Sequence, residues 1–241
     1  MNLYFVRHGQ SANNAAWDAT GTSNNRVEDP ELTDIGHQQA RHVAQFLAQA
    51  GSSAPANGRD PHNRRGFAIT HVYTSLMTRA VATGYAIAGA LGLPLVAWED
   101  WHEAGGVYLD DPVTGERTGL PGKPRSYFER HFPGIILPNH LDEAGWWNRP
   151  YEDDAARRQR ARRALADLLS RHGNTADNVV IVSHGEFFNL IMAEVLKSRG
   201  MDGWWFVLNN ASVSRLRFED ERETGIVYLN RVDFLPDALI T

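Results

Sequence analysis

The stretch that decides the fold is the N-terminal sequence MNLYFVRHGQS, residues 1–11. Residues 3–6 are an apolar run with aromatic and β-branched members, long enough for one buried strand. The run ends at Arg7 and His8, so a cation and an imidazole follow the expected strand directly. In an open α/β sheet, ligands bind beyond the carboxyl ends of the strands. We therefore expect both side chains at a ligand site, next to Gly9, whose missing side chain would let a ligand approach the backbone.

A second stretch of the same kind lies far along the chain, at residues 179–185, where VVIVS leads into His184 and Gly185. An apolar run typical of a helix follows at residues 187–196. If the two strands belong to one parallel sheet, the two histidines can face each other across a single pocket. The alternative is two unrelated turn histidines, each closing its own loop.

The composition is typical of a globular domain that can bury a large core. The chain has 241 residues, of which 42% are hydrophobic and 22% charged, and we expect a single domain over residues 1–241. A formal net charge of −5 argues against a general nucleic-acid binder, which is usually basic. The absence of cysteine excludes disulfides, thiolate catalysis and thiolate metal sites. No apolar run approaches the length of a membrane span, and the chain enters its first strand without a signal sequence, so we expect a cytoplasmic enzyme.

Hydrophobic periodicity predicts further elements around the two strand–His–Gly units. Helices are expected at 37–50, 76–91, 153–171 and 187–196, and strands at 67–73, 94–98, 211–218 and 226–231. Thr33 is the expected N-cap of the first of these helices. The polar residues from Ser11 to Pro30 suggest a loop, or a broken helix followed by a loop, and residues 51–66 suggest a mobile surface loop. Residues 107–150 have little periodicity and are expected to form a cap-like insertion.

Several short motifs resemble, in the right order, those of the histidine phosphatase superfamily, in its phosphoglycerate mutase-like branch. They are RHGQSxxN at residues 7–14, LTxxG at 32–36, YTSxxxRAxxT at 73–83, ExG at 103–105, SHG at 183–185 and NNASV at 209–213. The resemblance spans residues 1–109 and 151–218 and leaves out the insertion. It implies a three-layer α/β/α sandwich with a mostly parallel, mixed sheet and an inserted cap region.

The resemblance also implies roles for individual residues. His8 would be the nucleophile and form a phosphohistidine, which suits a neutral imidazole whose other nitrogen is fixed by a backbone carbonyl near Gly9. Around the transferring phosphoryl group the resemblance places Arg7, Asn14, Arg79, His184 and Gly185. The transition state spreads charge over three oxygens, so positioned donors suit it, and guanidinium groups offer bidentate contacts. Glu103 would protonate the leaving oxygen and then activate water.

Two neighbouring carboxylates, Glu99 and Asp100, are rival candidates for the proton donor. A glycine two residues after Glu103 matches the family spacing and favours Glu103. His102 is unusual in this pattern. It either influences the proton that Glu103 would donate or takes no part in the reaction, and we expect the second. The scheme requires no metal and no other cofactor. Histidines and carboxylates could hold a divalent ion, but two arginines aimed at the same pocket would repel it.

The residues that follow the expected acid bear on the reaction class. Mutases of the superfamily carry a basic Glu-Arg-His-Tyr-Gly stretch there, whereas this chain has EAGGV at residues 103–107. To retain and redeliver a phosphoryl group, an enzyme needs additional positively charged side chains around it and must exclude water. The absence of the basic mutase stretch therefore favours a metal-independent phosphomonoester hydrolase. Phosphoryl transfer of the cofactor-dependent phosphoglycerate mutase type is the alternative. A phosphate-binding module without turnover is a third hypothesis, which the retention of the catalytic positions disfavours.

The expected cap carries the residues that we would first consider for substrate selection. They are Lys123, Arg125, Tyr127, Arg130, His131, Trp146 and Trp147. Cations over the pocket would suit a small anionic metabolite such as a sugar phosphate. Equally, the aromatic residues could pack the insertion against the domain and the cations could face solvent. For Trp146 and Trp147 we expect core packing. The expected partner is thus a small phosphorylated substrate, with no nucleic acid and no membrane, and a homodimer is left open.

Overall fold

The fold is that of a computed structural model, which describes residues 1–22, 26–49, 60–198, 203–219 and 223–241. Residues 51–59 of the expected mobile loop lie outside the described residues. The rest of that loop is bound to the sheet: Asn63 donates to the Tyr4 hydroxyl at 2.7 Å and accepts from the Tyr228 hydroxyl at 3.0 Å. In the described part of the chain no helix has the length and apolar character needed to span a bilayer.

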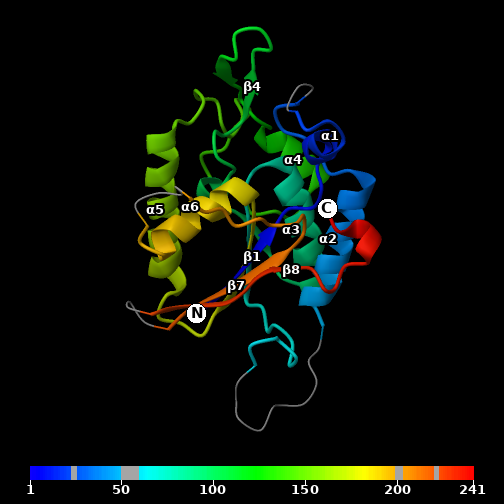
Figure 1. Cartoon of the computed structure of the whole chain (residues 1–241), viewed down its shortest axis with the longest axis vertical. Helices are drawn as coiled ribbons and strands as arrows, with labels where there is room; N and C mark the ends of the chain where they lie inside the picture. Colours follow the sequence, from blue (N-terminus) through cyan, green and yellow to red (C-terminus); the bar gives the residue numbers. More distant parts are fainter. Residues whose placement is uncertain (23–25, 50–59, 199–202, 220–222) are drawn as a thin grey trace.

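A six-stranded sheet forms the centre of the molecule (Figure 1). Its strand order is β3-β2-β6-β1-β7-β8. Its strands are β1 (Asn2–Arg7), β2 (His71–Thr74), β3 (Leu95–Ala97), β6 (Asn178–Ser183), β7 (Val213–Phe218) and β8 (Thr224–Arg231). The first four run parallel, whereas β7 is antiparallel to β1 and β8 is antiparallel to β7. The sheet is therefore mixed and mostly parallel, as the resemblance implies.

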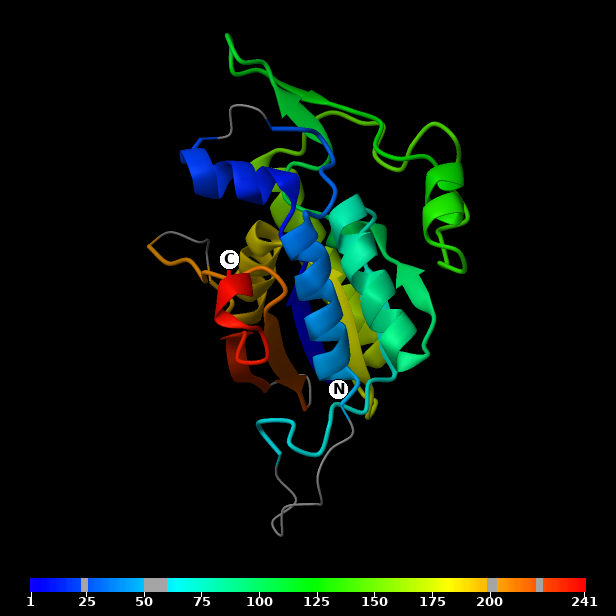
Figure 2. The ribbon, with the colours of Figure 1, turned by 90° about the vertical axis from the view of Figure 1, so that its right-hand side faces the viewer.

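Helices cover both faces of the sheet. Successive strand residues point to opposite faces, and in this sheet both faces carry apolar side chains that must be buried. In β1, Tyr4 packs into the core on one side and Phe5 into the core on the other. The helices are α2 (Asp34–Leu47) and α3 (Thr78–Leu91) over the first core, and α5 (Asp154–His172) and α6 (Gly185–Val195) over the second. Figure 1 shows the two pairs on opposite sides of the sheet, and Figure 2 shows α2 and α3 in front of it. This three-layer arrangement confirms the predicted fold class.

Local capping explains where the elements near the site begin. Helix α1 (Ala12–Thr20) occupies the polar segment for which the sequence predicts a loop or a broken helix. The Ser11 hydroxyl accepts from the Asn14 N–H, and the Asn14 side chain accepts from the Ser11 N–H, which together form a capping box. Thr33 caps α2 as predicted, accepting from the Gly36 N–H. Strand β2 is shorter than predicted, because Ala68 has a positive φ that interrupts the extended chain.

The insertion, residues 107–150, folds into three short elements joined by turns. They are strands β4 (Tyr108–Asp110) and β5 (Arg117–Gly119), which form a hairpin, and helix α4 (Arg125–His131). After α4 the chain returns to the main sheet, where Ile136 pairs with Val96 of β3 and so extends the sheet at that edge. The hairpin projects beyond the sheet near α1, at the top of Figure 2. Helix α4 lies to the right in the same view, on the flank of the molecule that α3 covers. Two 3₁₀ turns are also present, η1 (Glu99–Trp101) and η2 (Asp237–Leu239).

Candidate active site

His8 and His184 lie side by side at the carboxyl edge of the sheet. His8 directly follows β1 and His184 directly follows β6, and the parallel register pairs Arg7 with Ser183. The His8 N–H donates to Ser183 O at 3.0 Å, and the two imidazole centroids are 5.0 Å apart. Both histidines are buried. The prediction that the two strand-end histidines lie together is confirmed.

The hydrogen bonds of His8 define its tautomer. Its Nε2 accepts from Arg79 Nε at 3.1 Å, and because a guanidinium has only donors, this nitrogen carries no proton. Nδ1 therefore donates to Gly9 O at 2.7 Å, the kind of backbone acceptor that the sequence analysis expects. Burial, together with the charges of Arg79 and Arg7, holds the pKa of His8 well below its ordinary value. His8 is thus a neutral imidazole with a lone pair on Nε2, the form that a nucleophile requires.

Arg79, the second residue of α3, is held in place by a buried carboxylate. Asp29 Oδ1 lies 3.7 Å from Arg79 Nη1. Asp29 also accepts hydrogen bonds from the N–H and the hydroxyl of Thr78, at 3.0 and 2.8 Å. Burial raises the pKa of Asp29, and the charge of Arg79 is the strongest effect that opposes the rise. Asp29 thus fixes the start of α3 and the guanidinium that contacts His8.

The His184 side chain offers a buried hydrogen-bond donor. Its Nε2 lies 2.7 Å from Ser75 Oγ, which already accepts from Met77 N–H at 3.1 Å. Ser75 can donate its hydroxyl proton to Nε2, and in that arrangement the neutral His184 carries its own proton on Nδ1. This Nδ1 is buried and has no partner within the described part of the chain. Burial is the largest of the causes that hold the pKa of His184 well below its ordinary value, so the ring is neutral.

Arg7 offers a second donor of the same kind. Its Nη1 donates to Leu208 O, which fixes the guanidinium, whereas its Nε is buried and has no partner among the described residues. A buried donor left without an acceptor costs about 1–3 kcal/mol. Together Arg7 and His184 therefore direct two unmet donors to the neighbourhood of His8, an arrangement that suits a ligand with several oxygens.

Glu103 lies in the loop after η1, and its carboxylate is bound at the N-terminus of α6. Oε1 accepts from the N–H groups of Phe187 and Ala104, each at 2.9 Å, and Oε2 from the N–H of Glu186 at 3.3 Å. The N–H groups at a helix N-terminus have no intrahelical partner and attract anions. This contact holds the carboxylate at the edge of the sheet where His8 lies.

Glu186 is a second carboxylate at this place, and the sequence analysis did not select it. Burial raises the pKa of Glu186, the charge of Glu103 adds to the rise, and Arg157 opposes it. The rivals Glu99 and Asp100 are paired with arginines of the insertion and of α5. Neither appears among the described residues that line the cavity next to His8.

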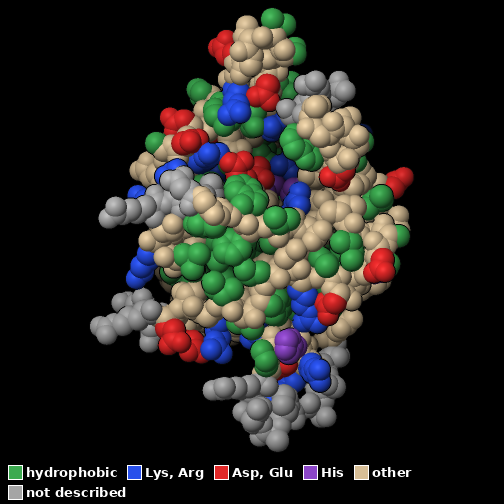
Figure 3. All heavy atoms as spheres, in the orientation of Figure 1, with side chains coloured by type: hydrophobic (Ala, Val, Ile, Leu, Met, Phe, Trp, Pro, Cys, Tyr) green, Lys and Arg blue, Asp and Glu red, His purple; other side chains and the backbone are tan. Residues whose placement is uncertain are grey.

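That cavity has a volume of about 400 Å³. The predicted site residues that line it are Arg7, His8, Asn14, Arg79, Glu103 and Gly185. His184 lies behind them, fully buried against His8. Figure 3 shows the hollow in the upper part of the view, where basic, acidic and histidine side chains meet. The structure thus brings the predicted set together in one place.

The contacts of Asn14 and Gly9 show what each residue does in the structure. Asn14 Oδ1 accepts from the helix-capping residue and from Asn210 Nδ2, the latter at 3.2 Å, which leaves the Asn14 amide nitrogen for the cavity. At Gly9 the structure shows a packing reason for the missing side chain. A Cβ at Gly9 would lie 2.5 Å from Gly36 O, so its missing side chain lets two backbone segments pack closely.

Helix α4 carries most of the cap residues considered for substrate selection, and their role in it stays a prediction. The residues concerned are Lys123, Arg125, Tyr127, Arg130 and His131, and the cavity is lined by others among the described residues. Arg125 instead donates to the backbone oxygens of Leu141 and Pro138, at 2.7 and 2.6 Å, and so joins parts of the insertion. Phe128 of α4 is fully buried in the core that α3 covers. Apolar packing therefore holds α4 against the core that α3 covers, while the Tyr127 hydroxyl donates to Glu31 at 3.3 Å and the charge of Lys123 acts on Asp29.

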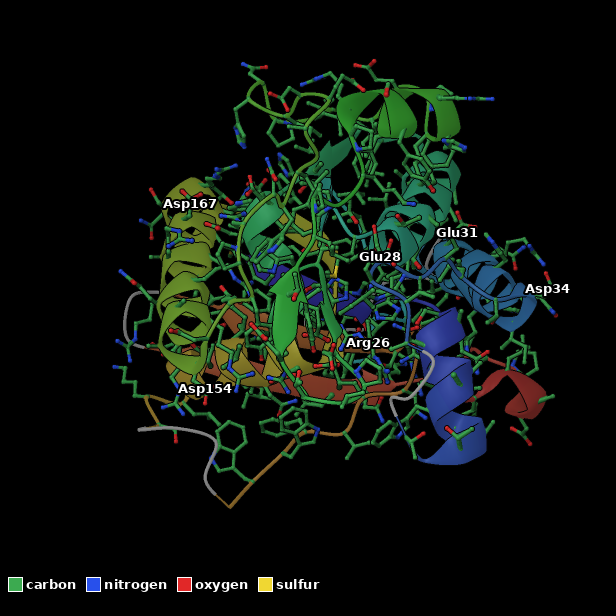
Figure 4. All side chains as sticks on the ribbon, turned by 90° about the horizontal axis from the view of Figure 1, so that it is seen from above. Arg26, Glu28, Glu31, Asp34, Asp154 and Asp167 are labelled. Carbon is green, nitrogen blue, oxygen red and sulfur yellow. The ribbon has the colours of Figure 1, made fainter. Side chains whose placement is uncertain are left out.

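The hairpin β4–β5 is the part of the insertion that borders the site. Tyr108 accepts a hydrogen bond from Arg26 Nη1 at 2.5 Å, and the Arg26 guanidinium carbon lies 4.0 Å from the Tyr108 ring centroid. Arg26 itself lines the cavity. Figure 4 looks down on this end of the molecule and shows Arg26 between the hairpin and α1. The insertion therefore limits the cavity on one side.

Trp146 and Trp147 pack in the core, as predicted. Each is 5% exposed. The ring of His102 contacts both indoles, with centroids 5.6 and 4.7 Å away, and its Nδ1 lies 2.8 Å from Glu103 O. Burial, assisted by an arginine of α5, holds the pKa of His102 well below its ordinary value. His102 is thus a neutral packing residue, which agrees with the expectation that it stands by.

The three-ligand metal candidate formed by the described residues lies elsewhere. His71, His172 and Asp177 place ligand atoms within 4.8 Å of one another. His71 begins β2 and Asp177 directly precedes β6, so the group stands at the opposite edge of the sheet from His8. His172 already binds Asp177 at 2.9 Å and the Tyr73 hydroxyl at 3.1 Å, which satisfies the ring without an ion.

The residues that hold the site together were predicted only in part. Ser75 and Asn210 stand inside motifs that the sequence analysis quotes, so their positions were marked although their contacts were not. Asp29 and Arg26 lie in a polar segment without periodicity, where the available signal is a carboxylate next to a proline. Glu186 follows the second His–Gly pair directly, and that position was its signal.

The comparison with protein families agrees with this geometry. The model of the histidine phosphatase superfamily (branch 1) matches residues 3–56 and 62–231. Among curated proteins, the 2,3-bisphosphoglycerate-dependent phosphoglycerate mutase 1 of Latilactobacillus sakei is 35% identical over 102 residues. The match covers 42% of this chain and 35% of the relative, so the chain matches about a third of the length of that relative.

Solved structures share the fold over nearly the whole chain. A phosphoserine phosphatase of Entamoeba histolytica, solved as a mutant in complex with phosphoserine, has a TM-score of 0.57 at 21% identity and covers 98% of this chain and 99% of its own. A mycobacterial glucosyl-3-phosphoglycerate phosphatase, solved with VO3, has a TM-score of 0.54 at 19% identity, with 90% of both chains covered. The family model extends over both histidine motifs, and the folds agree. The chain therefore belongs to the histidine phosphatase superfamily.

Proposed function

We propose that this chain is a metal-independent phosphomonoester hydrolase that acts on a small phosphorylated substrate through a phosphohistidine on His8. One observation carries the proposal: the neutral His8 Nε2 lies beside two buried donors, Arg7 Nε and His184 Nδ1, that find no acceptor among the described residues. A phosphoryl group supplies those acceptors and places its phosphorus next to the nucleophile. Catalysis of phosphoryl transfer depends mainly on such positioning and on charge stabilisation.

In the first step, the phosphoryl oxygens bind the donors of the site, which are Arg7, Asn14, Arg79, His184 and Gly185. Arg79 exchanges its hydrogen bond to His8 Nε2 for one to a phosphoryl oxygen. His8 Nε2 then attacks phosphorus in line, and the bond from phosphorus to the ester oxygen breaks. The ester oxygen takes a proton from the Glu103 carboxyl group and leaves as an alcohol. The bond from Nδ1 to Gly9 O stabilises the positive charge that the phosphorylated ring acquires.

In the second step, water attacks the phosphorus of the phosphohistidine. The Glu103 carboxylate takes the proton from this water, the bond from nitrogen to phosphorus breaks, and inorganic phosphate leaves. His8 returns to its neutral form. Between the two steps, the N–H groups at the start of α6 stabilise the Glu103 carboxylate. The arginines supply the positive charge, so no step calls for a metal ion.

The residues after Glu103 support hydrolysis rather than retention of the phosphoryl group. Gly105 and Gly106 have φ angles of +87° and +78°. A Cβ at Gly105 would lie 2.6 Å from the Tyr151 ring, and one at Gly106 would lie 2.1 Å from the Trp147 ring. The packing therefore leaves no room at these two positions for the histidine and tyrosine of the mutase stretch. Ala104 stands where that stretch has its arginine, so the cavity gains no cation there.

A mutase-type transfer is the second candidate, because the curated relative from Latilactobacillus sakei is named a phosphoglycerate mutase. A mutase returns the phosphoryl group from the phosphohistidine to a second hydroxyl instead of to water. The same histidines and arginines serve both reactions, so the fate of the phosphoryl group decides between them.

The test is phosphate release from p-nitrophenyl phosphate, sugar phosphates, phosphoglycerates and nucleotides in the presence of EDTA. We expect release that survives the chelator, is lost in His8→Ala and is kept in His37→Ala, a control on the exposed side of α2. Isomerisation of a phosphoglycerate without release would favour the mutase instead. Phosphate binding without either reaction would contradict both candidates and favour a binding module.

A further inference from the structure

The cavity extends beyond the phosphoryl site along one face of α1. The residues of α1 that line it include Asn13, Ala16, Trp17 and Thr20, which are spaced three and four apart and therefore share one side of the helix. Helix α1 has no fully buried residue, and Trp17 is 56% exposed. A large aromatic side chain is thus presented to the cavity and contributes little to the core.

The facing wall is the extended segment 205–208, all four residues of which line the cavity. Phe206 is anchored by the buried Asn189, which accepts from the Phe206 N–H at 2.7 Å and donates to its carbonyl at 3.0 Å. The Leu208 carbonyl binds Arg7 Nη1. Exposure alternates along this segment: Trp205 and Val207 are 52% and 73% exposed, whereas Leu208 is buried.

These apolar side chains form one wall of the same cavity that contains Arg7, His8 and Arg79. Large exposed apolar residues gathered at a concave site commonly mark a ligand-binding surface. A cavity of about 400 Å³ also has room for more than a phosphoryl group. The apolar wall, defined as Ala16, Trp17, Trp205 and Val207, therefore stands where the organic part of a bound phosphomonoester must lie.

We infer that the apolar wall binds the leaving group, and that the substrate class is phosphomonoesters of aliphatic or aromatic alcohols rather than of sugars. The inference rests on the proposed hydrolase function. It replaces the sugar phosphate expected from the cap cations, which do not line the cavity as the described residues define it. The charged groups at the rim have partners in part: Arg26 Nη1 donates to the Tyr108 hydroxyl while its Nε has no partner among the described residues, and Glu186 pairs with Arg157.

The inference predicts how the rate depends on the size of the leaving group. The n-alkyl phosphates from methyl to hexyl have leaving alcohols of similar chemistry, so differences in rate report binding of the chain. A methylene group that is fully removed from water gains about 0.8 kcal/mol, which is about fourfold. For an open cavity we expect kcat/KM to rise about threefold per methylene until the wall is covered.

Variants locate the effect on the wall. Trp17→Ala and Trp205→Ala should each lower kcat/KM for hexyl phosphate about tenfold and for methyl phosphate much less. Val113→Ala is the matched control, because Val113 is 91% exposed on the hairpin and does not line the cavity as the described residues define it. This control should keep the full dependence on chain length. The midpoint of urea unfolding, measured for each variant, shows that the loss is not one of folding.

A binding measurement separates the inference from the hydrolase function. Alkylphosphonates have a carbon–phosphorus bond that is not hydrolysed, and calorimetric Kd values for methyl- to hexylphosphonate report the wall alone. Affinity that rises with chain length, and falls in Trp205→Ala, supports the apolar wall even if no ester is hydrolysed, in which case the hydrolase proposal fails by itself. Hydrolysis that depends on His8 but not on chain length, or a preference for 3-phosphoglycerate over hexyl phosphate, would overturn the inference.

Discussion

Replacing Asp29 with asparagine should lower both the stability and the activity of the protein, because Asp29 acts through Arg79. The carboxylate is buried, lies 3.7 Å from Arg79 Nη1, and accepts two hydrogen bonds from Thr78. Asparagine has nearly the same shape, but it carries no charge and can accept only one of the two bonds from Thr78. The substitution thus leaves the Arg79 guanidinium buried without its nearest counter-charge.

The size of the effect follows from this geometry. Removing one partner of a buried ion pair costs about 3–5 kcal/mol. Glu103 also acts on the charge of Arg79, so we expect the lower end, a loss of about 3 kcal/mol in the free energy of unfolding. Arg79 would also lose its fixed position beside His8, and a misplacement of about 1 Å can cost about 100-fold in rate. We therefore expect kcat/KM of Asp29→Asn to fall about 100-fold.

The assay combines urea unfolding with kcat/KM for p-nitrophenyl phosphate. Glu28→Gln is the matched control, because the neighbouring Glu28, labelled in Figure 4, is exposed. Its stability and activity should stay close to those of the parent. If Asp29→Asn matched Glu28→Gln in both measurements, Asp29 would have no positioning role and the reasoning would be refuted.

Three other perturbations separate the roles of the buried groups. The three buried imidazoles have lowered pKa values, so below pH 6.5 the unfolded chain binds more protons than the folded one. The free energy of unfolding should therefore have its full value above pH 6.5 and decrease at lower pH, by up to about 1.4 kcal/mol per pH unit for each imidazole. Urea unfolding of His102→Asn should show a smaller decrease with falling pH. Ser75→Ala removes the group that sets the His184 tautomer and should lower kcat/KM about tenfold to 100-fold, whereas an unchanged value would mean that the tautomer does not matter. Glu103→Gln should slow an alkyl phosphate far more than p-nitrophenyl phosphate, whose leaving group needs no proton; if Glu186→Gln alone behaved in this way, Glu186 would be the proton donor.

The centre of the site could be predicted from sequence because it depends on local patterns. Two β-branched or aromatic runs that end in His–Gly are two strands with a histidine at the carboxyl end. Once both strands are parallel neighbours, as β1 and β6 are, His8 and His184 must meet. The acceptor for His8 Nδ1 is the carbonyl of the next residue, so it too follows from local chain geometry.

The rest of the site depends on contacts between distant segments that no local pattern specifies. Asp29 finds Arg79 only when α3 packs beside the segment that precedes α2. The placement of α4 is decided by the burial of Phe128 and by the pairing of Ile136 with β3, so the cations of α4 are not among the described residues that line the cavity. Asn189 holds the backbone of Phe206 beside the exposed Trp205, a contact that a pattern of apolar residues does not show.

The central claim is that the phosphoryl group passes through His8 before it reaches water. The stereochemistry at phosphorus tests this most directly, with a phosphomonoester made chiral by oxygen isotopes and transfer to an added alcohol acceptor in place of water. Each in-line displacement inverts the configuration, so two displacements through a phosphohistidine give net retention. We predict retention in the presence of EDTA, whereas net inversion would mean a single direct displacement and would contradict the account.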